Sequence, residues 1–307
     1  MRHLVNLQDY SESEIQDIIR LALRLKSEQK KGISHPLLPN KALGMIFSKA
    51  STRTRVSFEV GIRQLGGYGL FLNSSDIQLG RGETIEDTAK VLSRYLDGIM
   101  IRTFAQEDVE ELAKYSSIPI INGLTDMFHP CQILADLMTI HESKGKLKGL
   151  RLAYVGDGNN VAHSLLIGCS KMGLDITIAC PIGYEPQRDI VDWAIDNGKS
   201  SGSLVNITTQ PKEAVGDADI IYTDVWTSMG QEGESNERLK VFTPYQVNQD
   251  LLSLAKPNAI FLHCLPAHRG EEVTSEVIDG PQSLVFEEAE NRLHVQKAVL
   301  VSLMGGL

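Results

Sequence analysis

The 307-residue sequence lacks the features that mark several classes of protein. It has only four cysteines, at positions 131, 169, 180 and 264, and no two of them form a CxxC pair. This spacing excludes a zinc ribbon, and so few cysteines in so long a chain exclude a disulfide scaffold. No apolar run reaches about 18 residues, and the N-terminus lacks the apolar segment of a signal peptide. We therefore expect a cytoplasmic protein with reduced thiols and no membrane association.

Basic residues are also scarce. The chain has 30 Lys and Arg against 39 Asp and Glu, a formal net charge of −9 at pH 7. Because such a surface repels phosphate backbones, we expect no nucleic-acid partner, and an anionic ligand would need a local basic site. Hydrophobic residues make up 42% and charged residues 22%, as in globular proteins, and the length favours two domains.

Short apolar runs alternate with helical patterns along the whole chain. The expected strands lie at 42–47, 98–101, 118–121, 152–155, 175–179, 219–222 and 259–262. Such alternation predicts an α/β fold in which parallel sheets are covered by helices. A stretch rich in Gly and Lys, 143–149, separates the two series, so we place the domain boundary there. Acidic residues after Glu287 and glycines at 305 and 306 predict a final helix.

Gly156-x-Gly158 follows an expected strand and could indicate a dinucleotide-binding turn. Such a turn needs a third glycine and an acid near the end of the next strand. Here Val161 occupies the third glycine position, and the next strand ends at Ala179-Cys180-Pro181. We therefore favour a plain strand-to-helix turn at the edge of a site over binding of NAD or NADP.

The segment Ser51–Arg55 joins an expected strand to an expected helix. It combines backbone N–H groups, hydroxyls and guanidinium groups, and Lys49 adds a cation. These groups together suit an oxyanion such as phosphate. The alternative is a solvated basic turn whose serine and threonine cap the helix.

Further polar residues lie where strands end or helices begin. His129 and Gln132 stand near a helix start, while Asp224 and Cys264 each follow a buried strand. Ligands of open α/β sheets bind at the carboxyl ends of the strands, and Asp224 could accept hydrogen bonds from a cationic amine. The alternatives are a structural histidine, a loop or helix-capping acid and a buried thiol.

Together these segments resemble the aspartate/ornithine carbamoyltransferase family, most closely its ornithine-specific members, over nearly the whole chain. The segments that carry the resemblance are Ser51–Arg55, Gln78, Arg102, His129–Gln132, Asp224, Ser228–Gly230 and His263–Pro266. The resemblance implies a carbamoyl-phosphate-binding domain over 1–145, with helix 287–307 packing back on it, and an ornithine-binding domain over 146–286. It also implies two helices crossing between the domains, and a homotrimer with each active site near a subunit interface.

The resemblance implies a role for each matching residue. Carbamoyl phosphate would be bound by Ser51, Thr52, Arg53, Thr54, Arg102, His129, Gln132, Cys264, Leu265 and Arg292, and by Gln78 of the neighbouring subunit. Ornithine would be bound by Asn160, Asp224, Ser228 and Met229. The catalytic residues would be Arg102, His129, Asp224 and Cys264.

The implied reaction is carbamoyl transfer without a metal or an organic cofactor. The neutral δ-amine of L-ornithine attacks carbamoyl phosphate, and L-citrulline and phosphate are released. Aspartate, putrescine and acetylornithine remain alternative acceptors. The aspartate-specific pattern resembles His-Pro-Leu-Pro where this chain has His263-Cys264-Leu265-Pro266, and Asp224 suits a cationic amine better. A non-catalytic homologue would have lost a phosphate-binding arginine, whereas Arg53, Arg55 and Arg102 are all present.

Overall fold

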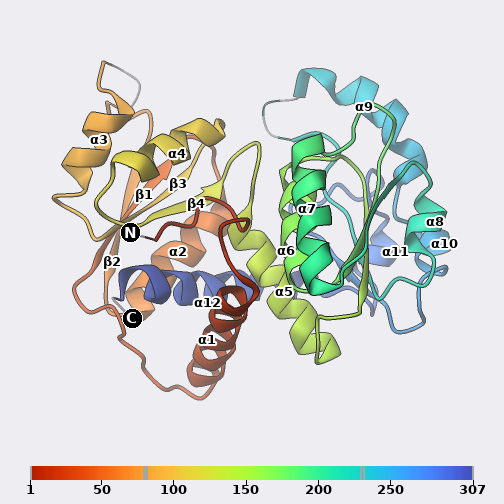
Figure 1. Cartoon of the computed structure of the whole chain (residues 1–307), viewed down its shortest axis with the longest axis horizontal. Coiled ribbons are helices and arrows are strands. Elements are labelled where there is room, and N and C mark those ends of the chain that lie inside the picture. The colour runs from red at the N-terminus through yellow and green to blue at the C-terminus, as the bar shows by residue number, and fades with distance from the viewer. Residues whose placement is uncertain (1, 79–81, 229, 231, 306–307) are drawn as a thin grey trace. The chain divides into compact units, whose positions relative to one another are not determined.

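The computed structural model describes residues 2–78, 82–228, 230 and 232–305, which form two compact units (Figure 1). Unit 1 comprises Met1–Met138 and Glu290–Leu307, and unit 2 comprises Thr139–Ala289. The divisions fall inside two helices, α5 (Pro130–Lys144) and α12 (Val285–Met304), so each of these helices contributes residues to both units.

Among the described residues of unit 1, four parallel strands form one sheet in the order β2-β1-β3-β4. The strands are β1 (Ala42–Phe47), β2 (Tyr68–Asn73), β3 (Gly98–Arg102) and β4 (Ile120–Leu124). The helices are α1 (Glu12–Lys30), α2 (Thr52–Gln64), α3 (Ile85–Leu92) and α4 (Gln106–Tyr115), besides parts of α5 and α12. Every residue of β1 and β3 is buried, because helices cover both faces of the sheet.

Alternate side chains of β1 pack against helices on opposite faces. Ala42 and Ile46 belong to an apolar cluster with Val109 of α4, whereas Met45 and Ile62 of α2 both approach Gly69 from the other face. Figure 1 shows α3 and α4 on one side of this sheet and α2 and α12 on the other. The period of two along the strand therefore determines which helix each side chain meets.

Among the described residues of unit 2, five parallel strands form the second sheet in the order β7-β6-β5-β8-β9. The strands are β5 (Arg151–Val155), β6 (Asp175–Ala179), β7 (Val205–Thr208), β8 (Ile220–Tyr222) and β9 (Ile260–Leu262). The helices are α6 (Asn160–Lys171), α7 (Arg188–Ser201), α8 (Pro211–Val215), α9 (Ser235–Phe242), α10 (Gln249–Leu252) and α11 (Ser275–Ile278). Figure 1 shows α6 and α7 on one face of the sheet and α8 and α10 on the other. The predicted α/β class, with two parallel sheets flanked by helices, is confirmed.

The ends of the elements differ from the predictions in a few places. Ser11 caps α1 in a capping box: its hydroxyl accepts from Glu14 N–H, and the Glu14 carboxylate accepts from Ser11 N–H. The last helix starts at Val285, two residues before the predicted Glu287, and Glu288 N–H already donates to Leu284 O. Strands β2 and β7 were not predicted, and both are edge strands with partly exposed residues.

Each sheet has a topological switch point, which lies between two adjacent strands where the strand order reverses. In unit 1 it lies between β1 and β3, because β2 follows on the far side of β1. In unit 2 it lies between β5 and β8, because β6 follows on the far side of β5. Open α/β sheets bind ligands outside the carboxyl ends of the strands at such points. The topology thus selects the segments after β1, β3, β5 and β8.

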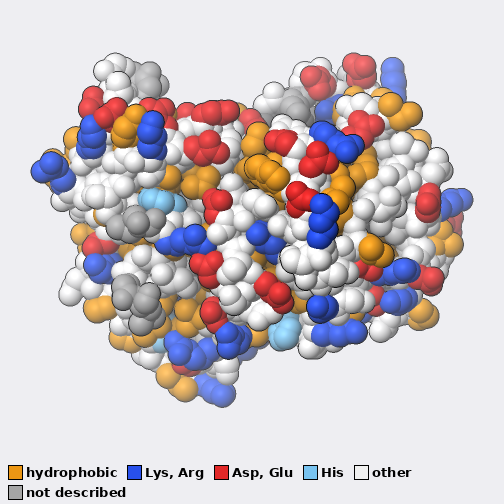
Figure 2. Space-filling model, viewed as in Figure 1, with side chains coloured by type: hydrophobic (Ala, Val, Ile, Leu, Met, Phe, Trp, Pro, Cys, Tyr) orange, Lys and Arg blue, Asp and Glu red, His pale blue; other side chains and the backbone are white. Residues whose placement is uncertain are grey.

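On the face drawn in Figure 2, acidic and basic side chains are interspersed. Acidic residues, which outnumber basic residues in the sequence, are therefore mixed with basic residues on this face. No helix in the part of the chain that the structure describes is long and apolar enough to cross a membrane.

Candidate functional site

The segment after β1 places a helix N-terminus at the switch point of unit 1. Ser51 has an extended backbone and caps α2, its hydroxyl accepting from Thr54 N–H at 3.1 Å. The helix starts at Thr52, with Arg53 in its first turn. A helix N-terminus offers N–H donors and the positive end of the helix dipole. The predicted strand-to-helix turn is therefore confirmed, and it is suited to an anion.

Three arginines surround His129 in unit 1. Arg102 ends β3, Arg53 lies in the first turn of α2 and Arg292 comes from α12. Burial is the main cause that holds the pKa of His129 well below its usual value of 6.5, and the charges of Arg292, Arg102 and Arg53 lower it further. His129 is 5% exposed, and Arg102 and Arg292 are 7% and 3% exposed. We call these four residues, with Ser51, Thr52, Thr54 and Gln132, the basic site. The imidazole of His129 is neutral at physiological pH, so this side chain can donate a hydrogen bond without carrying charge.

Arg292 connects three helices within the basic site. Its Nη1 donates to Gln132 Oε1 at 2.6 Å, and its Nη2 donates to Thr54 Oγ1 at 3.2 Å. Gln132 Nε2 in turn donates to Asp136 Oδ1 at 2.8 Å. These buried bonds fix the side chains before any ligand arrives, which lowers the cost of ordering them on binding.

Lys49 lies in the same region but already has an anionic partner. Its ammonium group forms an ion pair with the Asp126 carboxylate and lies 4.3 Å from the centre of the Phe104 ring. Asp126 N–H also donates to Phe104 O at 2.9 Å. Lys49 therefore ties the segments after β1, β3 and β4 together, a role that differs from the additional ligand cation predicted. Asp126 was not predicted as a site residue.

Gln78 lies apart from the basic site. Gln78 is exposed and follows β2, the edge strand of the first sheet. Its predicted contact with a neighbouring subunit stays a prediction. Met229 lies outside the described residues.

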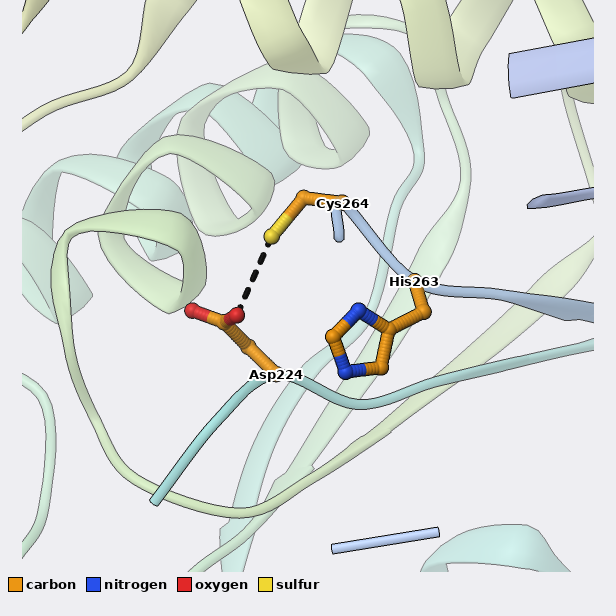
Figure 3. Close-up of side chains that lie close together, drawn as sticks. All are labelled: Asp224, His263 and Cys264. Carbon is orange, nitrogen blue, oxygen red and sulfur yellow. Dashed lines mark hydrogen bonds between the residues drawn. The ribbon is translucent and has the colours of Figure 1, made fainter. Parts of the chain in front are cut away.

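In unit 2, Asp224 and Cys264 follow the neighbouring strands β8 and β9, and their side chains point toward one another (Figure 3). Cys264 Sγ donates to Asp224 Oδ1 at 3.0 Å. Asp224 Oδ2 accepts from Asn159 Nδ2 at 2.8 Å. Asp224 is 5% exposed, and each of its oxygens keeps acceptor capacity for a further donor. We call Asp224, Cys264 and Asn159 the Asp–Cys site.

Asn159 was not predicted as a site residue, although its neighbour Asn160 was. Its Oδ1 caps α6 by accepting from Val161 N–H and Ala162 N–H at 3.0 and 3.2 Å. Its amide nitrogen is thereby aimed at Asp224. Asn160 is the first residue of α6. The signal that could have revealed Asn159 is its N-cap position after a strand.

Leu265, next to Cys264, has a left-handed backbone with φ of +56°, which is costly for leucine. The neighbouring His263 supports this turn: Leu265 N–H donates to His263 Nδ1 at 2.9 Å. Because Nδ1 accepts, Nε2 carries the proton, and it lies 3.2 Å from Glu272 Oε1. His263 N–H donates to Glu288 Oε2 at 3.0 Å. Buried carboxylates thus hold the turn that presents the Cys264 thiol.

A buried ion pair connects the segments on either side of the switch point in unit 2. Arg238 of α9 pairs with Asp157, and its Nε donates to Trp226 O at 2.5 Å. Burial is the main cause that raises the pKa of Asp157 to about 6; the charge of Asp224 also raises it, and Arg238 opposes the shift. Trp226 lies between the predicted residues Asp224 and Ser228, so Arg238 fixes this segment. Neither Asp157 nor Arg238 was predicted.

Asp224, His263 and Cys264 also offer three metal-ligating atoms within 4.8 Å of one another. Both ring nitrogens of His263 already have hydrogen-bonding partners, Leu265 N–H and Glu272. This imidazole would have to give up one of those partners to bind an ion.

Comparisons with known proteins show the family to which the chain belongs. Residues 2–142 match the family model described as "Aspartate/ornithine carbamoyltransferase, carbamoyl-P binding domain", and residues 148–303 match the one described as "Aspartate/ornithine carbamoyltransferase, Asp/Orn binding domain". A protein of Caldicellulosiruptor saccharolyticus named ornithine carbamoyltransferase is 65% identical over 301 residues, which cover 98% of each chain.

Solved structures give the same result. Ornithine carbamoyltransferase from Pyrococcus furiosus has a TM-score of 0.97 at 58% identity, covering 100% of this chain and 98% of that one. The anabolic enzyme from Campylobacter jejuni has a TM-score of 0.93 at 41% identity, covering 99% of each chain. The resemblance inferred from the motifs is confirmed, and the chain belongs to the aspartate/ornithine carbamoyltransferase family.

Proposed function

We propose that the protein transfers the carbamoyl group of carbamoyl phosphate to the δ-amine of L-ornithine, giving L-citrulline and phosphate. The observation that carries this proposal is the neutral, buried His129 among three arginines at the switch point of unit 1. The arginines would balance the charge of a dianionic phosphate, and the neutral imidazole would donate a hydrogen bond to the attached carbonyl group. Relatives named ornithine carbamoyltransferase at 58–65% identity support the same reaction. One of them, 58% identical, is named anabolic, so we place the reaction in arginine biosynthesis.

Carbamoyl phosphate would bind in the basic site. The phosphate would be bound by Arg53 and the α2 N-terminus, with hydroxyls from Ser51, Thr52 and Thr54. Arg102 and His129 would donate to the carbonyl oxygen and stabilise the negative charge that develops there. Gln132 Oε1, which accepts from Arg292, would also accept from the carbamoyl N–H.

Ornithine would bind in the Asp–Cys site. Asp224 would accept a hydrogen bond from the δ-amine, and the Cys264 thiol beside it would help to orient the nitrogen. Asn160, Ser228 and Met229 would hold the amino-acid end, and Leu265 with Cys264 would contact the carbamoyl group. An ammonium group cannot attack, so the amine must first lose a proton. A C–N bond then forms at the carbonyl carbon, the C–O bond to phosphate breaks, and the departing phosphate takes up the second proton from the nitrogen.

The charge of the Asp–Cys site favours a cationic acceptor over aspartate. Asp224 is buried, and Asp157 lies close to it. The negative charge of Asp224 helps to raise the pKa of Asp157 to about 6. An anionic aspartate side chain would be repelled there, whereas ornithine and putrescine bring a positive amine. Acetylornithine lacks only the charge of the α-amine.

We also propose the predicted domain roles and assembly. Residues 1–145 with helix 287–307 would form the carbamoyl-phosphate-binding domain, and 146–286 the ornithine-binding domain. We propose a cytoplasmic homotrimer in which Gln78 reaches the site of a neighbouring subunit. Edge strand β2 supports an interface, because its Tyr68, Leu70 and Phe71 are 52%, 43% and 38% exposed.

A ureido-product assay tests the reaction. Purified protein would be given carbamoyl phosphate with ornithine, acetylornithine, putrescine or aspartate in separate reactions. We expect kcat/KM for ornithine to exceed that for every other amine. Turnover of aspartate alone would contradict the proposed role of Asp224, and no ureido product with any amine would reject carbamoyl transfer.

A further inference from the structure

Unit 2 carries a second group of potential metal ligands, which is linked through His263 to the Asp224–Cys264 pair. His268, Glu271 and Glu272 lie in the segment between β9 and α11. One ligand atom from each lies within 4.8 Å of the others. His268 Nδ1 is 3.7 Å from Glu271 Oε2 and 3.8 Å from Glu272 Oε2. The three side chains therefore converge on one point.

These residues are held by a turn that is built into the unit. Glu271 N–H donates to His268 O at 2.9 Å, which closes the turn. Gln246 Nε2 donates to the carbonyl oxygens of Gly270 and Glu271 at 2.9 and 2.8 Å. The hydrogen bond within the turn and those from Gln246 therefore fix the backbone that carries the three ligands. Little of this backbone has to be ordered when an ion binds.

Glu272 supplies an observation that points independently to a bound cation. Its side chain is completely buried, and Oε1 accepts from His268 N–H at 2.6 Å and faces His263 Nε2. Its other oxygen, Oε2, is also buried and has no hydrogen-bonding partner among the described residues. A buried carboxylate oxygen without a partner is costly, and 3.8 Å to His268 Nδ1 is too long for a hydrogen bond. A cation between the two atoms would remove that cost.

The charge and geometry suit a divalent ion. Two carboxylates and a neutral imidazole carry a charge of about −2, and the nearby Arg269 does not cancel it, because its guanidinium is bound by Asp279 at 2.9 and 2.6 Å. Tetrahedral zinc with bonds of about 2.0–2.1 Å places its ligand atoms roughly 3.3–3.4 Å apart. The observed separations of 3.7 and 3.8 Å need a closure of about half an ångström, which His268 and Glu271 can supply because their side chains are 51% and 45% exposed.

We propose that His268, Glu271 and Glu272 form a binding site for a divalent transition-metal ion of the zinc type. One nitrogen and two oxygen ligands leave a fourth position for water. The imidazole ligand selects zinc-like ions over magnesium and calcium, which prefer oxygen. The hydrogen bond from His263 to Glu272 Oε1 acts as the outer support that orients a ligating carboxylate. None of the three ligands is proposed to contact a substrate, so substrates are not needed to test this site.

The test uses full-length protein carrying Cys264→Ser, because the Cys264 thiol beside Asp224 is another place where zinc can bind. Zinc affinity is measured by competition with a chromophoric chelator. On this background we expect one zinc per chain with a Kd of about 10 μM or tighter. His268→Ala and the isosteric Glu271→Gln should each weaken binding at least about 10-fold. Glu276→Gln, an exposed acid on α11, is the matched control and should leave the affinity unchanged.

Cobalt distinguishes the ligands directly. Cobalt bound to the Cys264→Ser protein should show visible absorption bands without a thiolate charge-transfer band, and His268→Ala should remove them. Failure of the Cys264→Ser protein to bind zinc at about 1 mM would overturn the proposal. Equal binding by the His268→Ala, Glu271→Gln and Glu276→Gln variants would also overturn it. Magnesium in excess should not displace the zinc; displacement by magnesium would argue for a simple acidic surface instead.

Discussion

Replacement of His129 tests the charge state on which the proposed mechanism depends. The imidazole is buried at 5% exposure, and three guanidinium groups add to the effect of burial in lowering its pKa. His129→Gln keeps a hydrogen-bond donor of neutral charge, whereas His129→Ala removes the donor. Loss of one donor to a developing oxyanion costs roughly 100- to 1000-fold in kcat. We therefore expect that loss in His129→Ala and a clearly smaller one in His129→Gln.

The pH dependence of the rate separates a neutral donor from an acid. If His129 is neutral throughout the range of the assay, His129→Gln and the wild type should have the same acid limb in kcat/KM for carbamoyl phosphate between about pH 6 and 8. Disappearance of that limb in His129→Gln would show that the imidazole titrates there, which would refute the reasoning. His141→Gln, on the same helix α5 and outside the basic site, controls for a general effect of losing a histidine.

The pH dependence of the free energy of unfolding gives a second test of the protonation state of His129. The pKa of His129 is lower in the folded protein than in the unfolded chain, where it is about 6.5. Below pH 6.5 the unfolded chain therefore binds more protons, and the free energy of unfolding falls by up to about 1.4 kcal/mol per pH unit from this group. Urea unfolding at pH 7.0 and 5.5 should show a smaller acid-induced loss in His129→Gln than in the wild type. An equal loss in the two proteins would contradict the burial of a neutral imidazole.

Three further predictions follow from other groups. Arg53→Ala should lower kcat/KM for carbamoyl phosphate at least about 100-fold, because a charge-assisted phosphate contact is lost; an unchanged value would reject a phosphate site at α2. Asp157→Asn should remove a group whose folded pKa, about 6, lies above its usual 3.8. The wild type should therefore gain stability relative to this variant as pH falls from about 6 to 4, measured by urea unfolding, and a constant difference would contradict the raised pKa. Finally, Arg53→Ala and Gln78→Ala subunits, each nearly inactive, should regain activity at about one quarter of sites when mixed one to one and reassembled, and no gain would place Gln78 outside the neighbouring site.

The central strands could be predicted from the sequence because their physical situation leaves a strong pattern. Strands β1 and β3 are buried on both faces, so they appear as continuous apolar runs. Edge strands β2 and β7 are paired on one side only and keep exposed residues, including Asn206 in β7. The four-residue β7 has a pattern close to that of a loop, whereas β2 is largely apolar, and neither strand was predicted.

The candidate site shows a similar division. Compact motifs, such as Ser51–Arg55 and His263–Pro266, could be recognised because their residues are neighbours in the sequence. Partners that lie far apart were not found. Asp126 is 77 residues from Lys49, and Arg238 of α9 is 81 residues from Asp157. No local pattern links such pairs, since only the order of strands in the sheet brings them together.

Strand order also accounts for the contrast between the two sites. In each unit the switch point brings together segments that are remote in sequence, but the side chains carried there differ in charge. Unit 1 gathers Arg53, Arg102 and Arg292 around a neutral histidine, and unit 2 gathers Asp157 and Asp224. Like charges held together in a buried place repel one another, and this repulsion is relieved when a ligand of opposite charge binds. We therefore propose that the same α/β topology serves an anion in one unit and a cation in the other, according to the side chains gathered at each switch point.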